Sequence, residues 1–204
     1  MHLLRIDASA RIEDSVTRRL ADELVAGLRE KDAGLRVTQR ELADGLPLLN
    51  EIWVNANFTD ADQRSAEQRE ALALSDELIA ELRAADAVAL SSPVYNFGVP
   101  AVLKAWVDLV TRARETFRYG AQGPEGLLKD RPVYLVMASG GTAIGSEIDF
   151  AGRYLQHILG FIGIRDVRVI AADQMMVDEA AAWRQARAQM QAALSLWRMR
   201  PWRR

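Results

Sequence analysis

Hydroxyl side chains gather in the segment "DASARIEDSVTRRL", where Ser9 precedes Ser15 and Thr17 and an amphipathic stretch begins at Leu20. Hydroxyls beside the free N–H groups of a helix N-terminus can hold a phosphate without any lysine, because that end carries a partial positive charge. The segment has no glycine-rich nucleotide-binding pattern, which favours one terminal phosphate. An equally good interpretation is that Asp14 or Ser15 only caps the helix.

Aromatic and amide side chains occupy a second segment, "SPVYNFGVP". Its two prolines can continue neither a strand nor a helix, so residues 94–99 are expected to form a fixed, largely extended turn. Tyr95 and Phe97 supply flat apolar surface that suits a planar ring, and Asn96 offers amide groups. Gly98 permits close approach of a ligand or a positive φ. The alternative is an ordinary turn between a strand and a helix.

A third segment, "ASGGT" at residues 138–142, contains Ser139 followed by Gly140 and Gly141. Paired glycines let backbone N–H groups touch a ligand that a Cβ would keep away. The pair could also be a flexible connector. Three such segments in one chain nevertheless favour a binding site, provided that the fold brings them together.

The apolar pattern predicts an alternation of strands and helices. Five runs are expected to be strands, at residues 3–8, 35–42, 87–92, 133–139 and 167–172, of which 35–42 alternates like an edge strand. Helical spacing of apolar residues recurs around Leu20–Leu28, Leu72–Leu82, Leu103–Val110 and Trp183–Trp197. This alternation predicts an α/β, flavodoxin-like three-layer sandwich with a parallel sheet of order 2-1-3-4-5. In that order the first and third strands are neighbours, so the first two segments would face each other across a crevice.

Composition narrows the function classes. The 204 residues carry a net charge of −2 and a pI near 5.8, which disfavours nucleic acid and membrane surfaces as partners. A chain of this size is expected to form one domain over residues 1–204, in the cytoplasm, since no signal or membrane-spanning segment is evident. There is no cysteine, and His2 and His157 are too far apart in sequence for a metal motif. We therefore expect a borrowed reagent, such as a bound cofactor, to supply the chemistry.

The stretch "PVYNFGVPAVLKAWVDLVTRARETFRYGAQGPEGLL", residues 93–128, resembles the FMN-dependent NADH-azoreductases, a homodimeric flavodoxin-like family of quinone and azo reductases. Further similarity lies in "SVTRRLADELV", in "SGG", and in "YLQHILGFIGI" at residues 154–164. The chain departs from the family in "DASARIED", where a Ser-Pro-Arg start is more common. It also has "ASGG" where many members carry "SRGG", so an arginine is missing there.

The resemblance implies FMN as cofactor, held by residues of the three segments. The implied cofactor-binding residues are Ser9, Ser15, Val16, Thr17, Pro93, Val94, Tyr95, Asn96, Phe97, Ser139, Gly140 and Gly141. It also implies a ping-pong cycle, in which NADH or NADPH gives a hydride to the flavin N5 and a quinone or azo compound then accepts it. No catalytic side chain is then required, because the flavin carries the chemistry.

Several other residues are expected around the acceptor. The segment 115–128 is expected to be a small hairpin with a Gly-Pro turn, and the resemblance implies that it lies beside the neighbouring subunit's flavin. Phe117 and Tyr119 are then candidate pocket residues, unless they only pack the hairpin. Tyr154, His157 and Phe161 share one helix face, where Phe161 would wall the pocket and His157 is better explained as an interface or core residue than as a proton donor.

Two segments lack clear periodicity or partners. Residues 46–58, "LPLLNEIWVNANF", are apolar but aperiodic and are expected to form a loop over a pocket, with Trp53 as a lid residue, or a buried irregular excursion. The basic tail "WRMRPWRR" is expected to be solvated or disordered.

Two other function classes stay open. The first is a nonenzymatic flavodoxin-type electron carrier, which the near-neutral charge disfavours. The second is a hydrolase that uses Ser9 or Ser139, although the chain has no G-x-S-x-G motif and no suitable histidine base.

Overall fold

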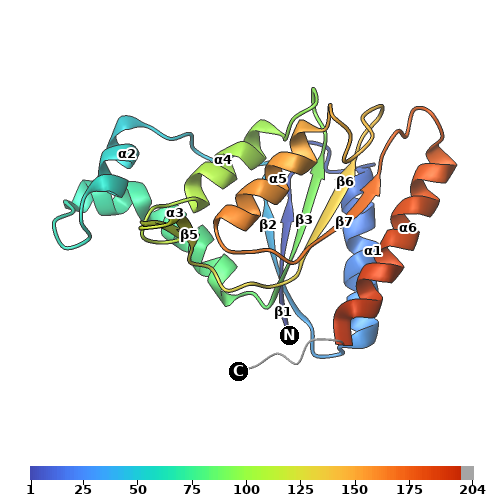
Figure 1. Cartoon of the computed structure of the whole chain (residues 1–204), viewed down its shortest axis with the longest axis horizontal. Coiled ribbons are helices and arrows are strands. Elements are labelled where there is room, and N and C mark those ends of the chain that lie inside the picture. Colours follow the sequence, from blue (N-terminus) through green and yellow to red (C-terminus); the bar gives the residue numbers. More distant parts are fainter. Residues whose placement is uncertain (199–204) are drawn as a thin grey trace.

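The computed structural model describes residues 1–198, in which five parallel strands form the central sheet (Figure 1). They are β1 (His2–Asp7), β2 (Arg36–Glu41), β3 (Ala87–Pro93), β6 (Val133–Ala138) and β7 (Val167–Ala172). Their order is β2-β1-β3-β6-β7, which confirms the flavodoxin-like α/β class. The numbering differs from the expected 2-1-3-4-5 because two further strands precede β6 in the chain and lie outside the sheet.

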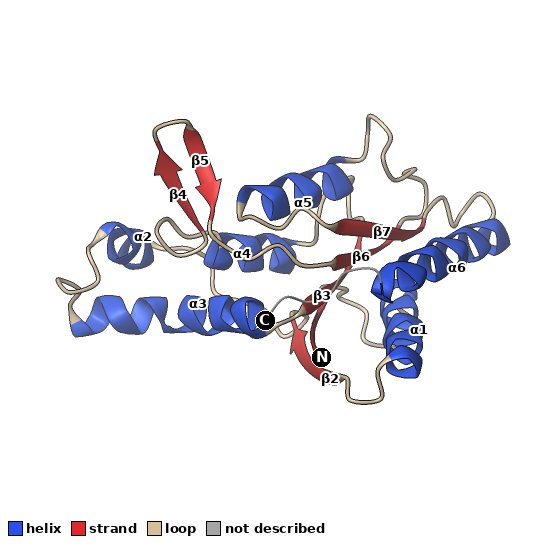
Figure 2. Cartoon of the chain, turned by 60° about the horizontal axis from the view of Figure 1, so that its bottom comes forward, coloured by secondary structure: helices blue, strands red, loops and turns tan. Residues whose placement is uncertain are grey.

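Helices cover both faces of the sheet (Figure 2). One face carries α1 (Val16–Lys31) and α6 (Glu179–Ser195), and the other carries α3 (Ala66–Ala84), α4 (Ala101–Val110) and α5 (Phe150–Phe161). Successive strand residues point to opposite faces, so Leu3 packs with the α1 and α6 side chains whereas Leu4 packs with those of α3 and α4. β2 forms one edge of the sheet, and its residues are half-buried or exposed.

Helix α1 begins where the hydroxyl segment ends, for reasons local to the sequence. Ser15 is the N-cap, and its side chain accepts a hydrogen bond from the Arg18 amide. Leu20, Leu24 and Leu28 recur every fourth residue and are fully buried against α6 and the sheet. This packing fixes the N-terminus of α1 at the edge of the sheet where the parallel strands end.

The loop expected over residues 46–58 is wrong in part, because α2 (Glu51–Phe58) is a helix. Asn50 caps it by accepting a hydrogen bond from the Trp53 amide at 2.9 Å. The run is aperiodic because its apolar residues lie on both sides of the helix: Trp53 is buried, whereas Ile52 is exposed. α2 packs on α3 and extends that layer away from the sheet (Figure 2).

The expected hairpin is present as β4 (Phe117–Gly120) and β5 (Gly123–Gly126). Its turn lies at residues 121–122 and not at the Gly-Pro pair, because Gly123 pairs with Gly120 and Pro124 with Tyr119. Residues 199–204 of the basic tail lie outside the described residues. None of the helices within residues 1–198 is both long enough and apolar enough to cross a bilayer.

Candidate functional site

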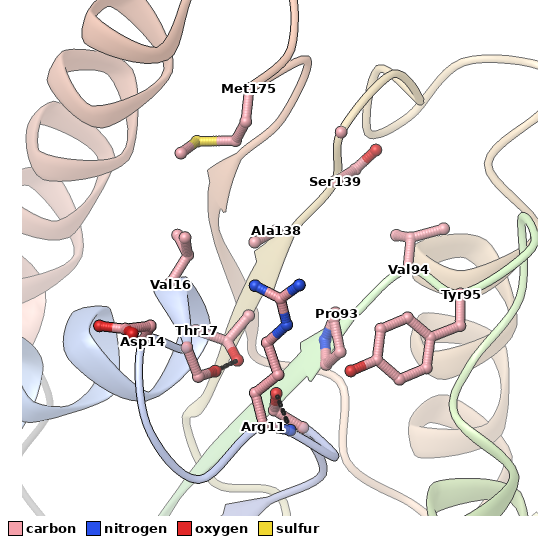
Figure 3. A pocket seen from close by; sticks show the side chains of 13 residues that line it. Arg11, Asp14, Val16, Thr17, Pro93, Val94, Tyr95, Ala138, Ser139 and Met175 are labelled. Atoms are coloured by element: carbon pink, nitrogen blue, oxygen red, sulfur yellow. Dashed lines mark hydrogen bonds between the residues drawn. The ribbon is translucent and has the colours of Figure 1, made fainter.

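A cavity of about 250 Å³ opens at the edge of the sheet where β1, β3 and β6 end (Figure 3). Four loops contribute its walls, each of them directly following a strand of the sheet. The lining residues are Ser9, Arg11, Asp14, Ser15, Val16, Thr17, Pro93, Val94, Tyr95, Ala138, Ser139, Gly140 and Met175. The sheet order therefore brings together segments that are far apart in sequence.

Three buried hydroxyl groups lie at the α1 side of the cavity. Ser9 is 2% exposed, and its Oγ accepts a hydrogen bond from the Arg11 amide at 3.2 Å. The Oγ of Ser15 lies 3.2 Å from the Oγ1 of Thr17, and both residues are buried. The first N–H groups of α1 have no acceptor within the helix, so this wall offers several hydrogen-bond donors to a ligand.

Arg18 fixes the backbone of the loop between β1 and α1 through hydrogen bonds to two of its carbonyls. Its Nε donates to the Arg11 carbonyl at 2.8 Å, and its Nη2 donates to the Ser9 carbonyl at 2.9 Å. Its guanidinium also binds both oxygens of Glu41, the last residue of β2, at 2.5 and 2.7 Å. This pairing raises the pKa of Arg18 and lowers the pKa of Glu41, because each charge stabilises the other. The loop is therefore fixed to the edge strand before any ligand arrives.

A buried carboxylate joins the strand ends beneath the cavity. Asp7, which is 0% exposed, accepts hydrogen bonds from Arg5 Nε at 2.7 Å, Gln39 Nε2 at 2.9 Å and Ser91 Oγ at 2.6 Å. These donors come from β1, β2 and β3. A buried charge with this many partners stabilises the relative positions of the three strands at the floor of the site.

The aromatic segment is a tight turn, so the expectation of a largely extended one is wrong. Tyr95 and Gly98 exchange both backbone hydrogen bonds, each at 3.0 Å. The two residues between them, Asn96 and Phe97, have φ values of 49° and 66°. Two left-handed residues are the geometry of a type I′ turn, and so the positive φ expected at Gly98 falls on Asn96 and Phe97 instead. A left-handed Phe is strained, since its Cβ crowds the backbone.

The third loop is fixed by its own hydroxyl and by the loop after β7. Ser139 Oγ accepts a hydrogen bond from the Thr142 amide at 2.7 Å, and the Ser139 carbonyl accepts one from Met175 at 3.0 Å. A Cβ on Gly140 would lie 3.0 Å from the sulfur of Met176, whereas a Cβ on Gly141 would meet nothing within 4 Å. Gly140 is thus favoured by the neighbouring Met176 side chain, and close approach of a ligand to the glycine pair stays a prediction.

The structure brings most of the expected cofactor residues to one cavity. Nine of the twelve line it; those that do not are Asn96, Phe97 and Gly141. Among the expected acceptor residues, Phe117, Tyr119 and Phe161 form a separate aromatic cluster. The ring centroids of Phe117 and Phe161 are 4.6 Å apart, and those of Phe117 and Tyr119 are 5.6 Å apart. Within one chain this cluster does not line the cavity.

Two more cavities accommodate the remaining expected residues. One of about 710 Å³ lies between α4 and α5, next to the aromatic turn, and is lined by Lys104, Tyr154 and the exposed His157. Burial raises the pKa of Tyr154 in this wall. Another, of about 300 Å³, lies between α2, α4 and α5, and its lining includes Trp53. Neither shares a lining residue with the site at the strand ends.

Four residues that line the cavity at the strand ends were not expected to bind the cofactor: Arg11, Asp14, Ala138 and Met175. Arg11 and Asp14 stand in the first segment, so their proximity to Ser9 and Ser15 was a usable signal. Met175 follows β7, the last strand of the sheet. It contacts Ser139 in space, but nothing in the sequence around either residue indicates that contact. Only the pairing of β6 with β7 places Met175 beside the third loop.

Comparison with known proteins accounts for this arrangement. Residues 1–194 match the sequence model of a protein family whose description is "flavodoxin-like fold". The chain belongs to this family. A relative from Jannaschia sp., named FMN-dependent NADH:quinone oxidoreductase 1, is 52% identical over 191 residues, which cover 94% of this chain and 97% of the relative. The FMN-dependent NADH:quinone oxidoreductase of Thiobacillus denitrificans is 56% identical over 177 residues, covering 87% of this chain and 86% of the relative.

Solved structures agree with the sequence relatives. The azoreductase of Bacillus anthracis str. Sterne has a TM-score of 0.84 and 25% identity, and the alignment covers 96% of this chain and 98% of that one. An FMN-dependent NADH-azoreductase of Bacillus anthracis str. Ames Ancestor, solved in complex with FMN, gives the same TM-score, identity and coverage. The resemblance that the sequence suggested is therefore confirmed.

Proposed function

We propose that this protein is an FMN-dependent NADH:quinone oxidoreductase that also reduces azo compounds. The observation that carries the proposal is the cavity at the ends of β1 and β3, where buried hydroxyls face an aromatic turn. The names of the relatives from Jannaschia sp. and Thiobacillus denitrificans support the quinone as acceptor and NADH as donor. The names of the Bacillus anthracis structures support the azo activity and FMN.

The cavity fits a flavin mononucleotide because its walls divide into a polar and an apolar part. Ser9, Ser15, Val16 and Thr17 would hold the phosphate through hydroxyl and backbone N–H groups. Residues 93–97 would flank the ring, and residues 139–141 would lie near its pyrimidine end. Aromatic stacking contributes about 0.5–1.5 kcal/mol beyond area burial, which favours flat substrates over any particular hydrogen-bond pattern.

The residues of the chain would bind and position the reactants. When bound, FMN supplies the hydride acceptor and donor that the side chains lack. The type I′ turn presents Tyr95, 38% exposed, at the cavity wall with its backbone fixed by two hydrogen bonds. Ser139 is held by Thr142, so the third loop keeps its N–H groups in place. A site positioned in this way needs no acid–base side chain, and none is proposed.

We propose further that the chain works as a homodimer, as one FMN-binding domain over residues 1–204, in the cytoplasm. Phe117, Tyr119 and Phe161 would then wall the acceptor pocket of the neighbouring subunit, with Trp53 beside them. Two observations support this. The aromatic cluster lies away from the cavity of its own chain, and Tyr119 is 77% exposed although it is aromatic.

Anaerobic flavin spectroscopy followed by turnover tests the proposal. The pure protein should bind FMN, NADH should bleach the flavin absorbance, and menadione should restore it over many cycles. Tight FMN binding without steady-state NADH consumption would identify an electron carrier instead. If the protein does not bind FMN at all, the result would favour a hydrolase that uses Ser9 or Ser139.

The dimer is tested separately by sedimentation and by a matched pair of variants. Tyr119→Ala should lower kcat/KM for menadione while leaving the Kd for FMN unchanged, and Tyr119→Phe should retain most activity. A monomer in solution, or equal activity of both variants, would contradict the shared acceptor pocket.

A further inference from the structure

Arg11 places a guanidinium group in the mouth of the cavity, where the part of the chain that the structure describes offers it no partner. Figure 3 shows its side chain extending from the first loop into the space between Thr17 and Pro93. Within residues 1–198, no carboxylate forms an ion pair with Arg11 and no oxygen accepts a hydrogen bond from its guanidinium. An arginine with five free donors beside buried hydroxyls is suited to bind a phosphoryl group, because its planar fork matches two phosphate oxygens.

The backbone of Arg11 is fixed even though its side chain is free. Its amide donates to Ser9 Oγ at 3.2 Å, and its carbonyl accepts from Arg18 Nε at 2.8 Å. The two arginines of this region therefore differ in role. Arg18 directs its donors to the Ser9 and Arg11 carbonyls and to Glu41, so its charge is neutralised inside the protein. The charge of Arg11 is not neutralised, and it faces the ligand space.

We infer that Arg11 makes this site selective for a phosphorylated flavin over riboflavin, by binding the phosphate of FMN from the side opposite α1. The inference rests on the proposed function, since it assumes that a flavin occupies the cavity. The hydroxyls of Ser9, Ser15 and Thr17 are neutral and would bind a phosphate without distinguishing its charge strongly. Arg11 adds a full positive charge to the partial one of the α1 N-terminus, and so its hydrogen bonds favour a phosphate dianion over an uncharged group.

Equilibrium binding of FMN and riboflavin to the apoprotein tests the inference. Arg11→Gln should weaken FMN about 30-fold, which is ~2 kcal/mol at 1.4 kcal/mol per tenfold, while riboflavin affinity changes less than about twofold. Arg11→Lys should recover part of the loss, because it keeps the charge but not the fork. FMN binding to the wild type should weaken with added salt more steeply than binding to Arg11→Gln.

Arg29→Gln is the matched control. It removes the same charge from the exposed C-terminal end of α1. At a rise of 1.5 Å per residue, Arg29 lies about 20 Å along the helix from Val16 at its N-terminal end. It should leave the FMN-to-riboflavin affinity ratio unchanged. If the wild type binds neither flavin, the proposed function fails. If Arg11→Gln weakens both flavins equally, weakens neither, or only raises the KM for NADH, then the proposed function stands and this inference is overturned; the last result would assign the cation to the phosphates of the donor nucleotide.

Discussion

Replacing Arg18 with Gln should test whether the first loop is held in place by the arginine beneath it. Arg18 is 8% exposed and makes charged hydrogen bonds to two carbonyls as well as to Glu41. Removing one partner of a buried ion pair costs about 3–5 kcal/mol. The Glu41 side chain is 27% exposed and can regain water, so we expect the lower end, about 3 kcal/mol of unfolding free energy. The FMN affinity should fall by about tenfold or more, because the loop is no longer preorganised.

Urea unfolding of the apoprotein at neutral pH measures the first effect, and FMN titration measures the second. A double-mutant cycle with Glu41→Gln separates the pair from its surroundings. Glu41→Gln alone should cost about 1 kcal/mol, and the double variant should be more stable than additivity predicts by about 1–2 kcal/mol. Arg29→Gln serves as the control for a simple loss of positive charge.

The pH dependence gives an independent measure of the same contact. Arg18 lowers the pKa of Glu41 in the folded protein. A carboxylate with a depressed folded pKa contributes stability that is present above its unfolded pKa, about 4.3, and is lost as the pH falls through the folded pKa. Arg18→Gln should therefore flatten the loss of stability below about pH 4.3. The reasoning is refuted if the free energy of unfolding of Arg18→Gln lies within about 0.5 kcal/mol of the wild-type value. It is also refuted if the effects of Arg18→Gln and Glu41→Gln are additive.

Three further changes follow from local geometry. Phe97→Gly should be more stable than Phe97→Ala by about 0.5–1 kcal/mol in urea unfolding, because glycine avoids the left-handed strain at φ 66°; the usual order, with alanine more stable, would mean that the turn is not type I′. Ser15→Ala should cost about 1 kcal/mol and also weaken FMN, whereas Ser65→Ala, which removes the cap of α3, should cost a similar amount without changing the FMN Kd. Burial raises the pKa of Tyr134 to about 12, and its buried hydroxyl has no hydrogen-bond partner within residues 1–198. Tyr134→Phe should accordingly raise the free energy of unfolding by about 1 kcal/mol, seen as a higher melting temperature. A lower melting temperature would indicate that the hydroxyl has a hydrogen-bond partner.

The sequence by itself determined the secondary structure of the sheet and most helices. Buried parallel strands are continuous apolar runs and helices repeat every 3.6 residues, so both signals are local and the predicted strand ends lie within a residue or so of those observed. The sequence offered Asp14 or Ser15 as the cap of this helix, and the structure shows that Ser15 is the N-cap. Residues 51–58 were misjudged because α2 has apolar side chains on both its buried and its exposed sides, which removes the periodic signal.

The tertiary structure decided which residues share the cavity and what each does there. Met175 reaches the site only because β7 pairs with β6, and the separation of Phe117, Tyr119 and Phe161 from it depends on where the hairpin packs. The left-handed turn at Asn96 and Phe97 is closed by backbone hydrogen bonds, and the side chains of these residues do not indicate it. The different roles of Arg11 and Arg18, one free and one neutralised by Glu41, depend on the pairing of β1 with β2. Apart from the turn, whose hydrogen bonds are local, these contacts join residues distant in the chain, so sequence spacing alone could not reveal them.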